Sequence, residues 1–182
     1  MSPLVPWHDR LSAELGLAEI PGPGSRPRIL EMAAAVARSH PRLEWIAAFY
    51  EDDDIPWCGL AVAWAMVASG LTPPLPNPLS ARAWAEWGRP LSTPVPGAVL
   101  VFARQGGGHV GLYEGEDKAR YLVLGGNQGN RVGRDPVARS RLLADAAGRP
   151  IGIRWPATVP VPAGAGPVRL DLSAGAASRD ER

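Results

Sequence analysis

The sequence predicts a single α+β domain in which N-terminal helices pack on an antiparallel β-sheet. In the first part of the chain, apolar residues such as Trp7, Leu11 and Leu15 recur at helical spacing. The second part holds short runs rich in β-branched residues, such as PGAVLVFA at 96–103, separated by glycine-containing turns. Helices that come first and strands that follow, joined by tight turns, favour an α+β fold.

The segment from Trp57 to Ser69 gives the strongest helix signal. It has no polar face, which is typical of a buried central helix, and Gly70 follows as a C-terminal stop. In chain order, helices are expected over residues 7–17, 28–39, 42–50, 57–69 and 79–88. Strands are expected over residues 96–103, 109–115, 120–126, 130–137 and 151–156. We assign residues 1–159 to one domain and expect 160–182, which has few residues to bury, to be a disordered tail.

Composition excludes several classes of function. The net charge of +1 over 182 residues provides no general attraction to nucleic acid or to an anionic membrane. A single cysteine excludes an internal disulfide and a Cys-rich metal site, and the three histidines lack metal-binding spacing, so no metal or cofactor is expected. The apolar run around residue 58 is shorter than the ~20 residues of a membrane span. Residues 1–16 lack the basic start and unbroken apolar run of a signal peptide, which predicts synthesis in the cytoplasm without a leader.

Cys58, the only cysteine, stands at the start of this apolar helix. A thiol attacks a carbonyl as thiolate, and its ordinary pKa of about 8.5 must be lowered for this at neutral pH. The positive end of a helix dipole and a nearby histidine both lower it. Cysteine is also among the residues most often buried for packing alone, so the residue type by itself does not decide between the two roles.

His109 is the candidate base. It follows three glycines and opens the expected strand 109–115. A base of this kind needs a polar group on its other ring nitrogen, and Asn127 comes directly after the next strand. Because the start of one antiparallel strand lies beside the end of its neighbour, we expect these residues to be close, with Gln128 as the alternative orienting residue. A simple turn role for Asn127 remains open.

The order Cys58, His109, Asn127, together with the segments PWCGLAVAWAM, PGAVLVF, GHVGLYEG and LGGNQGNRV, resembles the small CHAP/NlpC-P60-like cysteine peptidases of phages and bacteria. The resemblance covers residues 7–156. It implies a papain-like fold, with Cys58 as nucleophile, His109 as base and Asn127 as the third, polar member. The chain departs from the family in carrying Gly59 where relatives commonly have serine.

The resemblance also implies a function, which is hydrolysis of a peptidoglycan amide bond by an amidase or endopeptidase. Tyr50 matches a tyrosine that precedes the cysteine in some relatives, and Trp57, next to the thiol, is a candidate for lining a subsite. The expected partner is peptidoglycan, reached in the periplasm or cell wall through a holin, a phage or gene-transfer-agent tail, or a secretion system. The alternatives are an antibacterial effector with the same chemistry, a non-catalytic wall-binding or virion module, and an acyltransferase. The bond that is cut does not follow from the sequence.

Overall fold

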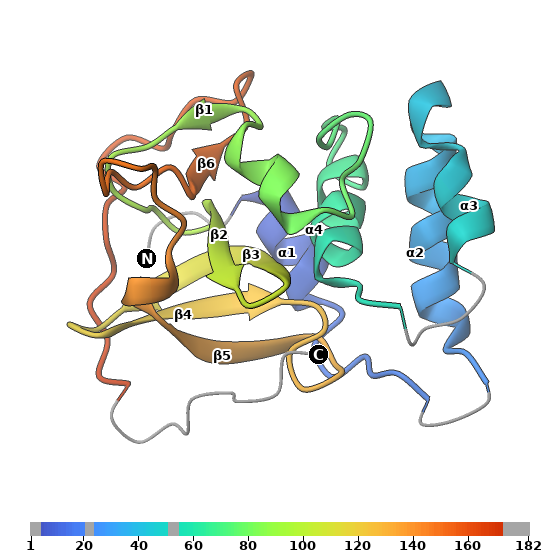
Figure 1. Ribbon diagram of the computed structural model, residues 1–182, viewed down its shortest axis with the longest axis horizontal. Coiled ribbons are helices and arrows are strands. Elements are labelled where there is room, and N and C mark those ends of the chain that lie inside the picture. The colour runs from blue at the N-terminus through green and yellow to red at the C-terminus, as the bar shows by residue number, and fades with distance from the viewer. Residues whose placement is uncertain (1–4, 21–23, 51–54, 173–182) are drawn as a thin grey trace.

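The computed structural model describes residues 5–20, 24–50 and 55–172. In this part of the chain four α-helices accompany a six-stranded antiparallel sheet (Figure 1). The predicted α+β class is therefore confirmed, with helices in the first part of the chain and strands in the second. No helix within the described ranges is both long enough and apolar enough to cross a membrane.

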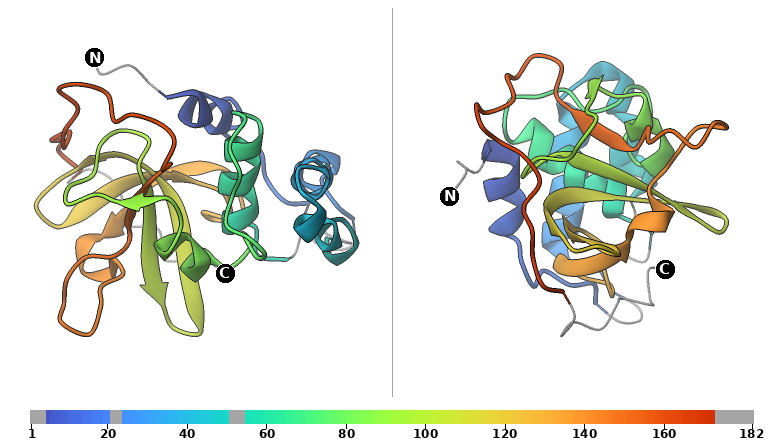
Figure 2. Two further views of the ribbon diagram at one scale, coloured as in Figure 1. Left: turned by 90° about the horizontal axis from the view of Figure 1, so that it is seen from above. Right: turned by 90° about the vertical axis from the view of Figure 1, so that its left-hand side faces the viewer.

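The helices form two layers beside the sheet. Figure 2 shows α4 between the sheet on one side and the pair α2 and α3 on the other. The α-helices are α1 (Pro6–Ser12), α2 (Pro27–Arg38), α3 (Trp45–Phe49) and α4 (Cys58–Val67). Three short 3-10 helices accompany them: η1 (Pro41–Leu43), η2 (Ala81–Ala85) and η3 (Arg139–Arg141).

The sheet has the strand order β1-β6-β2-β3-β4-β5, and its central hairpins connect neighbours in sequence. Its strands are β1 (Arg89–Pro90), β2 (Val99–Arg104), β3 (Gly107–Glu116), β4 (Arg120–Gly125), β5 (Gly133–Ala138) and β6 (Ile153–Trp155). The tight turn between β2 and β3 holds the start of β3 beside the end of β2, where Phe102 pairs with His109. This pairing fixes the position of the candidate base in the sheet.

Helix α4 is buried over nearly its whole length, as its lack of a polar face predicts. It packs against α1, α2 and β3. Its second residue is Gly59, where an added Cβ would lie 2.5 Å from the carbonyl oxygen of Leu79. A glycine is therefore required at position 59 by the loop that crosses the start of the helix.

Three expected helices differ in the structure, and one of them, expected over residues 42–50, is divided into η1 and the short α3. The first ends at Ser12 rather than at residue 17, because the following residues pair with the segment before β5: Gly16 N–H donates to Val132 O, and Ala18 forms a bridge with Arg131. Residues 81–85 form a 3-10 helix instead of an α-helix. Strand β1 was not expected, since two residues are too few to produce a sequence pattern.

The expected disordered tail is wrong for residues 160–172. Glu116 and the segment around Val168 exchange main-chain hydrogen bonds, in which Glu116 N–H donates to Val168 O and Leu170 N–H donates to Glu116 O. Arg169 forms an ion pair with the buried carboxylate of Glu116, and Val168 N–H donates to the Tyr113 hydroxyl. The segment is thus held by β3, a partner that local composition cannot reveal. Residues 173–182 lie outside the described part.

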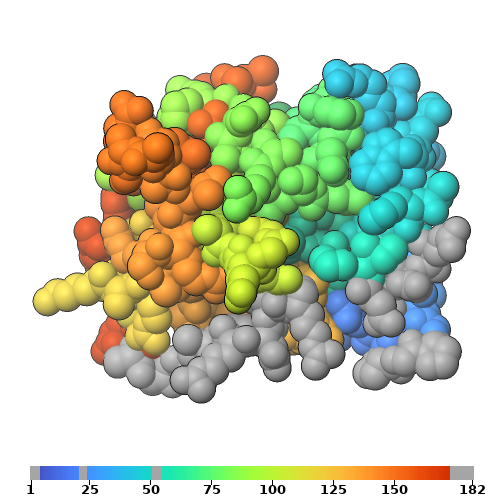
Figure 3. Space-filling model, viewed as in Figure 1, coloured from blue at the N-terminus to red at the C-terminus, as the bar shows by residue number. Residues whose placement is uncertain are grey.

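The outer surface of the helical layer meets the loop that follows α4. Figure 3 shows the side chains of α3, in cyan, beside those of this loop, in green. The indole of Trp45 donates a hydrogen bond to Pro76 O at 3.2 Å across this contact. The helical layer is therefore joined to the rest of the domain on both sides of α4.

Candidate active site

Cys58 is the first residue of α4 and is 9% exposed. The helical hydrogen bonds begin when Ala61 N–H donates to Trp57 O, so the N–H groups of the first turn have no acceptor within the helix. These groups and the helix dipole place positive potential around the sulfur. The structure therefore places the thiol at a helix N-terminus, as the sequence predicts.

His109 lies in β3, on the strand that packs against α4, and is almost completely buried. Its ring stacks on that of Phe102, with 6.3 Å between the ring centroids and 27° between the planes. The imidazole forms a hydrogen bond with the thiol of Cys58. The structure thus brings together the nucleophile and the base that the sequence suggested from 51 positions apart, residues 58 and 109.

Gln128 is the hydrogen-bond partner of the histidine on its other side. Its side-chain oxygen Oε1 lies 3.0 Å from Nε2 of His109. Its Nε2 donates to two main-chain carbonyls, Val123 O at 3.1 Å and Gly133 O at 2.8 Å. Because carbonyls only accept, the amide group can point in one direction alone, with its oxygen toward the imidazole.

This orientation determines the tautomer of His109. An amide oxygen accepts, so Nε2 of the imidazole must carry the proton that it donates to Gln128. In the neutral ring Nδ1 is then left as the nitrogen with a lone pair, available for the proton of Cys58. This is the protonation pattern that a histidine needs to act as a base toward a thiol.

The pKa of the Cys58 thiol is lowered by this environment. Burial alone would raise the pKa, because it disfavours the thiolate. The hydrogen bond from His109, the charge of its imidazolium, and the N–H groups of Val110 and Gly59 outweigh burial and lower it. The main-chain contribution of Val110 could not be expected from residue types, since any residue supplies an N–H group.

Asn127 comes close to the site, as expected, but Gln128 accepts the hydrogen bond from His109. Continuing the β3–β4 register beyond the pair Leu112 and Leu124 places position 127 opposite position 109. Asn127, however, has φ 54°, in the left-handed region, so the chain turns there and the next side chain points back between the strands. Gln128, the alternative orienting residue, is therefore the one that contacts His109.

Tyr50 and Trp57 support the site from the helical side. The Tyr50 hydroxyl donates to Pro56 O at 2.8 Å, and burial raises the pKa of this phenol, as does negative charge on Cys58. The indole of Trp57 donates to a carboxylate oxygen of Glu19 at 2.6 Å and is fully buried. Trp57 therefore offers no face to a substrate, and the expectation that it lines a subsite is not met.

Two glycines at the end of β4, Gly125 and Gly126, allow the close approach of sheet and helix. A Cβ on Gly125 would lie 3.0 Å from Gln128 Oε1 and 3.5 Å from His109 Nε2. A Cβ on Gly126 would lie 2.5 Å from the Cβ of Ala61 and 2.8 Å from the ring of Trp57. Side chains at these positions would separate the imidazole from its partner and the sheet from α4.

The arginines that follow β4 are engaged in local ion pairs. Arg131 pairs with Asp135, Arg134 with Glu114, and Arg139 with Glu116. These ion pairs neutralise part of the positive charge of this segment. Across the residues that the structure describes, no group of three His, Cys, Asp or Glu side chains is arranged to hold a metal ion.

Comparison of the chain with protein-family models, with curated proteins and with solved structures finds no match. The site is accordingly characterised by its own geometry. That geometry consists of a thiol at a helix N-terminus, an imidazole in a defined tautomer, and an amide that holds the imidazole in place.

Proposed function

We propose that the chain is a cysteine hydrolase of peptidoglycan amide bonds, an amidase or endopeptidase with a papain-like, CHAP/NlpC-P60-like fold. The observation that carries the proposal is the chain of contacts from Cys58 through His109 to Gln128, with the thiol pKa lowered. A residue that only fills space in the core has no need of an oriented imidazole. The assignment of the substrate rests on the sequence resemblance.

In the proposed reaction, Nδ1 of His109 takes the proton of the Cys58 thiol. The thiolate then attacks the carbonyl carbon of the amide, forming a C–S bond, and the Cys58 N–H group donates to the developing oxyanion. The C–N bond breaks as the His109 imidazolium gives its proton to the leaving amine. Gln128 holds the imidazole throughout, as a positioning residue.

A water molecule completes the cycle. His109 accepts a proton from the water as its oxygen attacks the thioester carbon, so that a C–O bond forms and the C–S bond breaks. The proton then returns from His109 to the sulfur of Cys58. The products are a carboxylic acid and an amine, and the enzyme is restored without an added cofactor.

We place the activity in the periplasm or cell wall, where peptidoglycan is found. Delivery through a holin-dependent lysis system, a phage or gene-transfer-agent tail, or a secretion machine is compatible with this location. A neighbouring holin gene would favour the first route, and a neighbouring immunity gene would favour an effector sent through a secretion machine.

Digestion of purified sacculi tests the proposal. The wild-type chain should release soluble fragments with new amino and carboxyl termini, which mass spectrometry identifies together with the bond cut. Cys58→Ala should remain folded and release none, because the small buried side chain contributes little to packing compared with its catalytic role. Release by the folded Cys58→Ala variant at the wild-type rate would refute the thiol mechanism.

A further inference from the structure

A second candidate binding site lies at the other end of α4. A cavity of about 310 Å³ opens between the loop after α4, the turn before β1 and the segment after β6. It is lined by Gly70, Leu71, Thr72, Trp87, Gly88, Pro156, Ala157 and Thr158. Since α4 has 10 residues, each rising about 1.5 Å, roughly 15 Å of helix separates this cavity from the thiol at Cys58.

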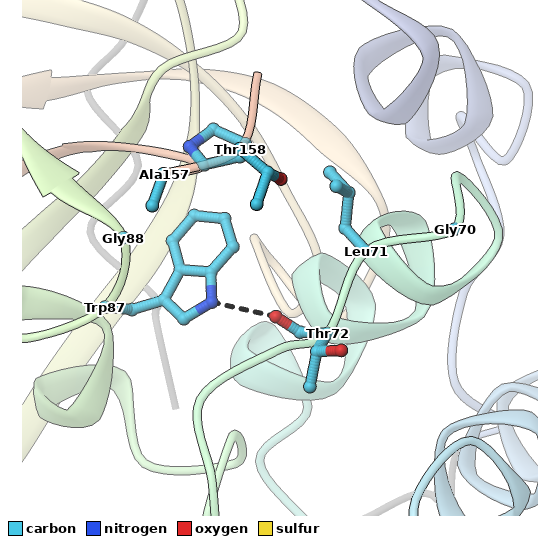
Figure 4. Close-up of a pocket in the computed structure, with 8 residues that line it drawn as sticks. Gly70, Leu71, Thr72, Trp87, Gly88, Ala157 and Thr158 are labelled. Carbon is cyan, nitrogen blue, oxygen red and sulfur yellow. Dashed lines mark hydrogen bonds between the residues drawn. The ribbon is translucent and has the colours of Figure 1, made fainter.

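The indole of Trp87 is the central side chain of the cavity, with Thr158 and Thr72 at its two ends and Leu71 across from it (Figure 4). The indole N–H donates to Thr72 O at 2.9 Å, and the ring packs edge-on against Trp84, with 5.1 Å between the ring centroids. The aromatic wall is therefore fixed before any ligand arrives.

The main chain beneath the indole is equally constrained. The buried guanidinium of Arg154 donates to Trp87 O at 2.7 Å and to Gly88 O at 3.3 Å. Gly88 has φ +60°, and an added Cβ would lie 2.1 Å from Trp155 O. A preformed wall loses little conformational entropy on binding, so more of the contact energy with a ligand is realised as affinity.

The lining indicates the chemistry of the ligand. None of the lining side chains carries a charge, so a neutral ligand is favoured. The wall combines an indole, Leu71 and Pro156 with the hydroxyl-bearing residues Thr72 and Thr158. A volume near the lower limit of about 300 Å³ for ligand cavities suits a single ring rather than an extended chain.

We propose that this cavity binds one neutral sugar ring. A pyranose has an apolar face of C–H groups that matches an indole, and a rim of hydroxyls that matches the threonines. In a cell-wall hydrolase, such a site would hold the polysaccharide while a nearby peptide amide is cut. The role of holding the polysaccharide during cleavage rests on the proposed function, whereas the binding of a sugar ring does not.

The test uses full-length Cys58→Ala protein, so that no turnover occurs, and an oligomer of β-1,4-linked N-acetylglucosamine as the probe. The indole N–H signal of Trp87 is assigned by its loss in Trp87→Phe. Titration of the probe should shift this signal with a dissociation constant on the order of 1 mM, typical of a small neutral ligand. The signal of Trp45, on α3, should stay unchanged.

Thr158→Tyr is the blocking variant, because residue 158 is exposed and lines the cavity. It should weaken binding at least about tenfold, while Thr93→Tyr, a matched change at an exposed position outside the lining, should not. The assignment would be overturned if the Trp87 signal did not shift, if its shift were unaffected by Thr158→Tyr, or if cyclohexanol produced an equal shift. These outcomes do not depend on whether the chain cuts sacculi, so each proposal can fail without the other.

Discussion

The side-chain oxygen of Gln128 lies 3.0 Å from Nε2 of His109, although the strand register places Asn127 opposite the histidine. The left-handed conformation at Asn127 turns the chain so that the following side chain faces the imidazole. Two main-chain carbonyls then fix the amide of Gln128. The tautomer of His109 is therefore determined by the turn after β4.

This relationship predicts opposite results for two neighbouring substitutions. Gln128→Met keeps similar volume but removes the acceptor, and should lower the rate of sacculus digestion about tenfold to a few hundredfold, corresponding to roughly 1–3 kcal/mol. Asn127→Gly should leave most of the rate, because glycine readily adopts φ 54°. The reverse pattern, an active Gln128→Met and an inactive, folded Asn127→Gly, would return the orienting role to Asn127.

The pH dependence of thiol alkylation tests the pairing of Cys58 with His109. Since the pKa of Cys58 is lowered, iodoacetamide should react with the folded protein with a midpoint below the ordinary thiol pKa. In His109→Ala the hydrogen bond and the charge of the imidazole no longer offset the burial of the thiol, so the midpoint should move to higher pH than in the wild type. Identical profiles for the two proteins would show that the imidazole does not activate the thiol. Cys58→Ser provides the unreactive control.

A methyl group at position 125 should disturb the site without unfolding the chain. In Gly125→Ala the new Cβ would lie 3.0 Å from Gln128 Oε1, so the amide must shift and its bond to the imidazole must lengthen. The expected result is a loss of about tenfold in kcat with KM little changed, since the nucleophile and base remain. Gly107→Ala, on the same strand as His109, meets nothing within 4 Å and should be silent. Equal kcat values for the two variants would contradict the close contact.

The C-terminal segment should contribute to stability. A chain ending at Val159 loses the main-chain hydrogen bonds to Glu116, the Val168–Tyr113 hydrogen bond and the Arg169 ion pair. At about 0.5–1.5 kcal/mol for each hydrogen bond, the free energy of unfolding in urea should fall by about 2–4 kcal/mol. A chain ending at Leu172, which keeps these contacts, is the matched control. An unchanged free energy of unfolding for the shorter chain would show that these contacts do not stabilise the fold.

The sequence predicts the elements of this fold better than it predicts the contacts between them. Helix α4 is evident because no polar residue interrupts it, and β2 to β4 are evident from branched and aromatic residues between turns. The shortening of α1 and the docking of residues 168–170 depend on partners more than 50 residues away, which local patterns do not encode.

In the candidate site, too, the residues are easier to predict than the contacts between them. Cysteine and histidine are recognisable by residue type, and antiparallel topology places the end of β4 beside His109. The choice between residues 127 and 128 depends on one backbone angle, and an Asn-Gln pair in a glycine-rich turn is compatible with either outcome. The contribution of Val110 N–H to the thiol pKa is a main-chain effect and leaves no signal in the sequence.

The burial of α4 links the thiol to the cooperativity of the whole domain. A helix enclosed by α1, α2 and β3 cannot fray or slide independently, so its N-terminus moves only when several layers separate. The environment of Cys58 should accordingly persist through the native baseline of a denaturant titration and disappear in one step with the global transition. Mutations far from the thiol would then affect it by changing how often the entire domain opens.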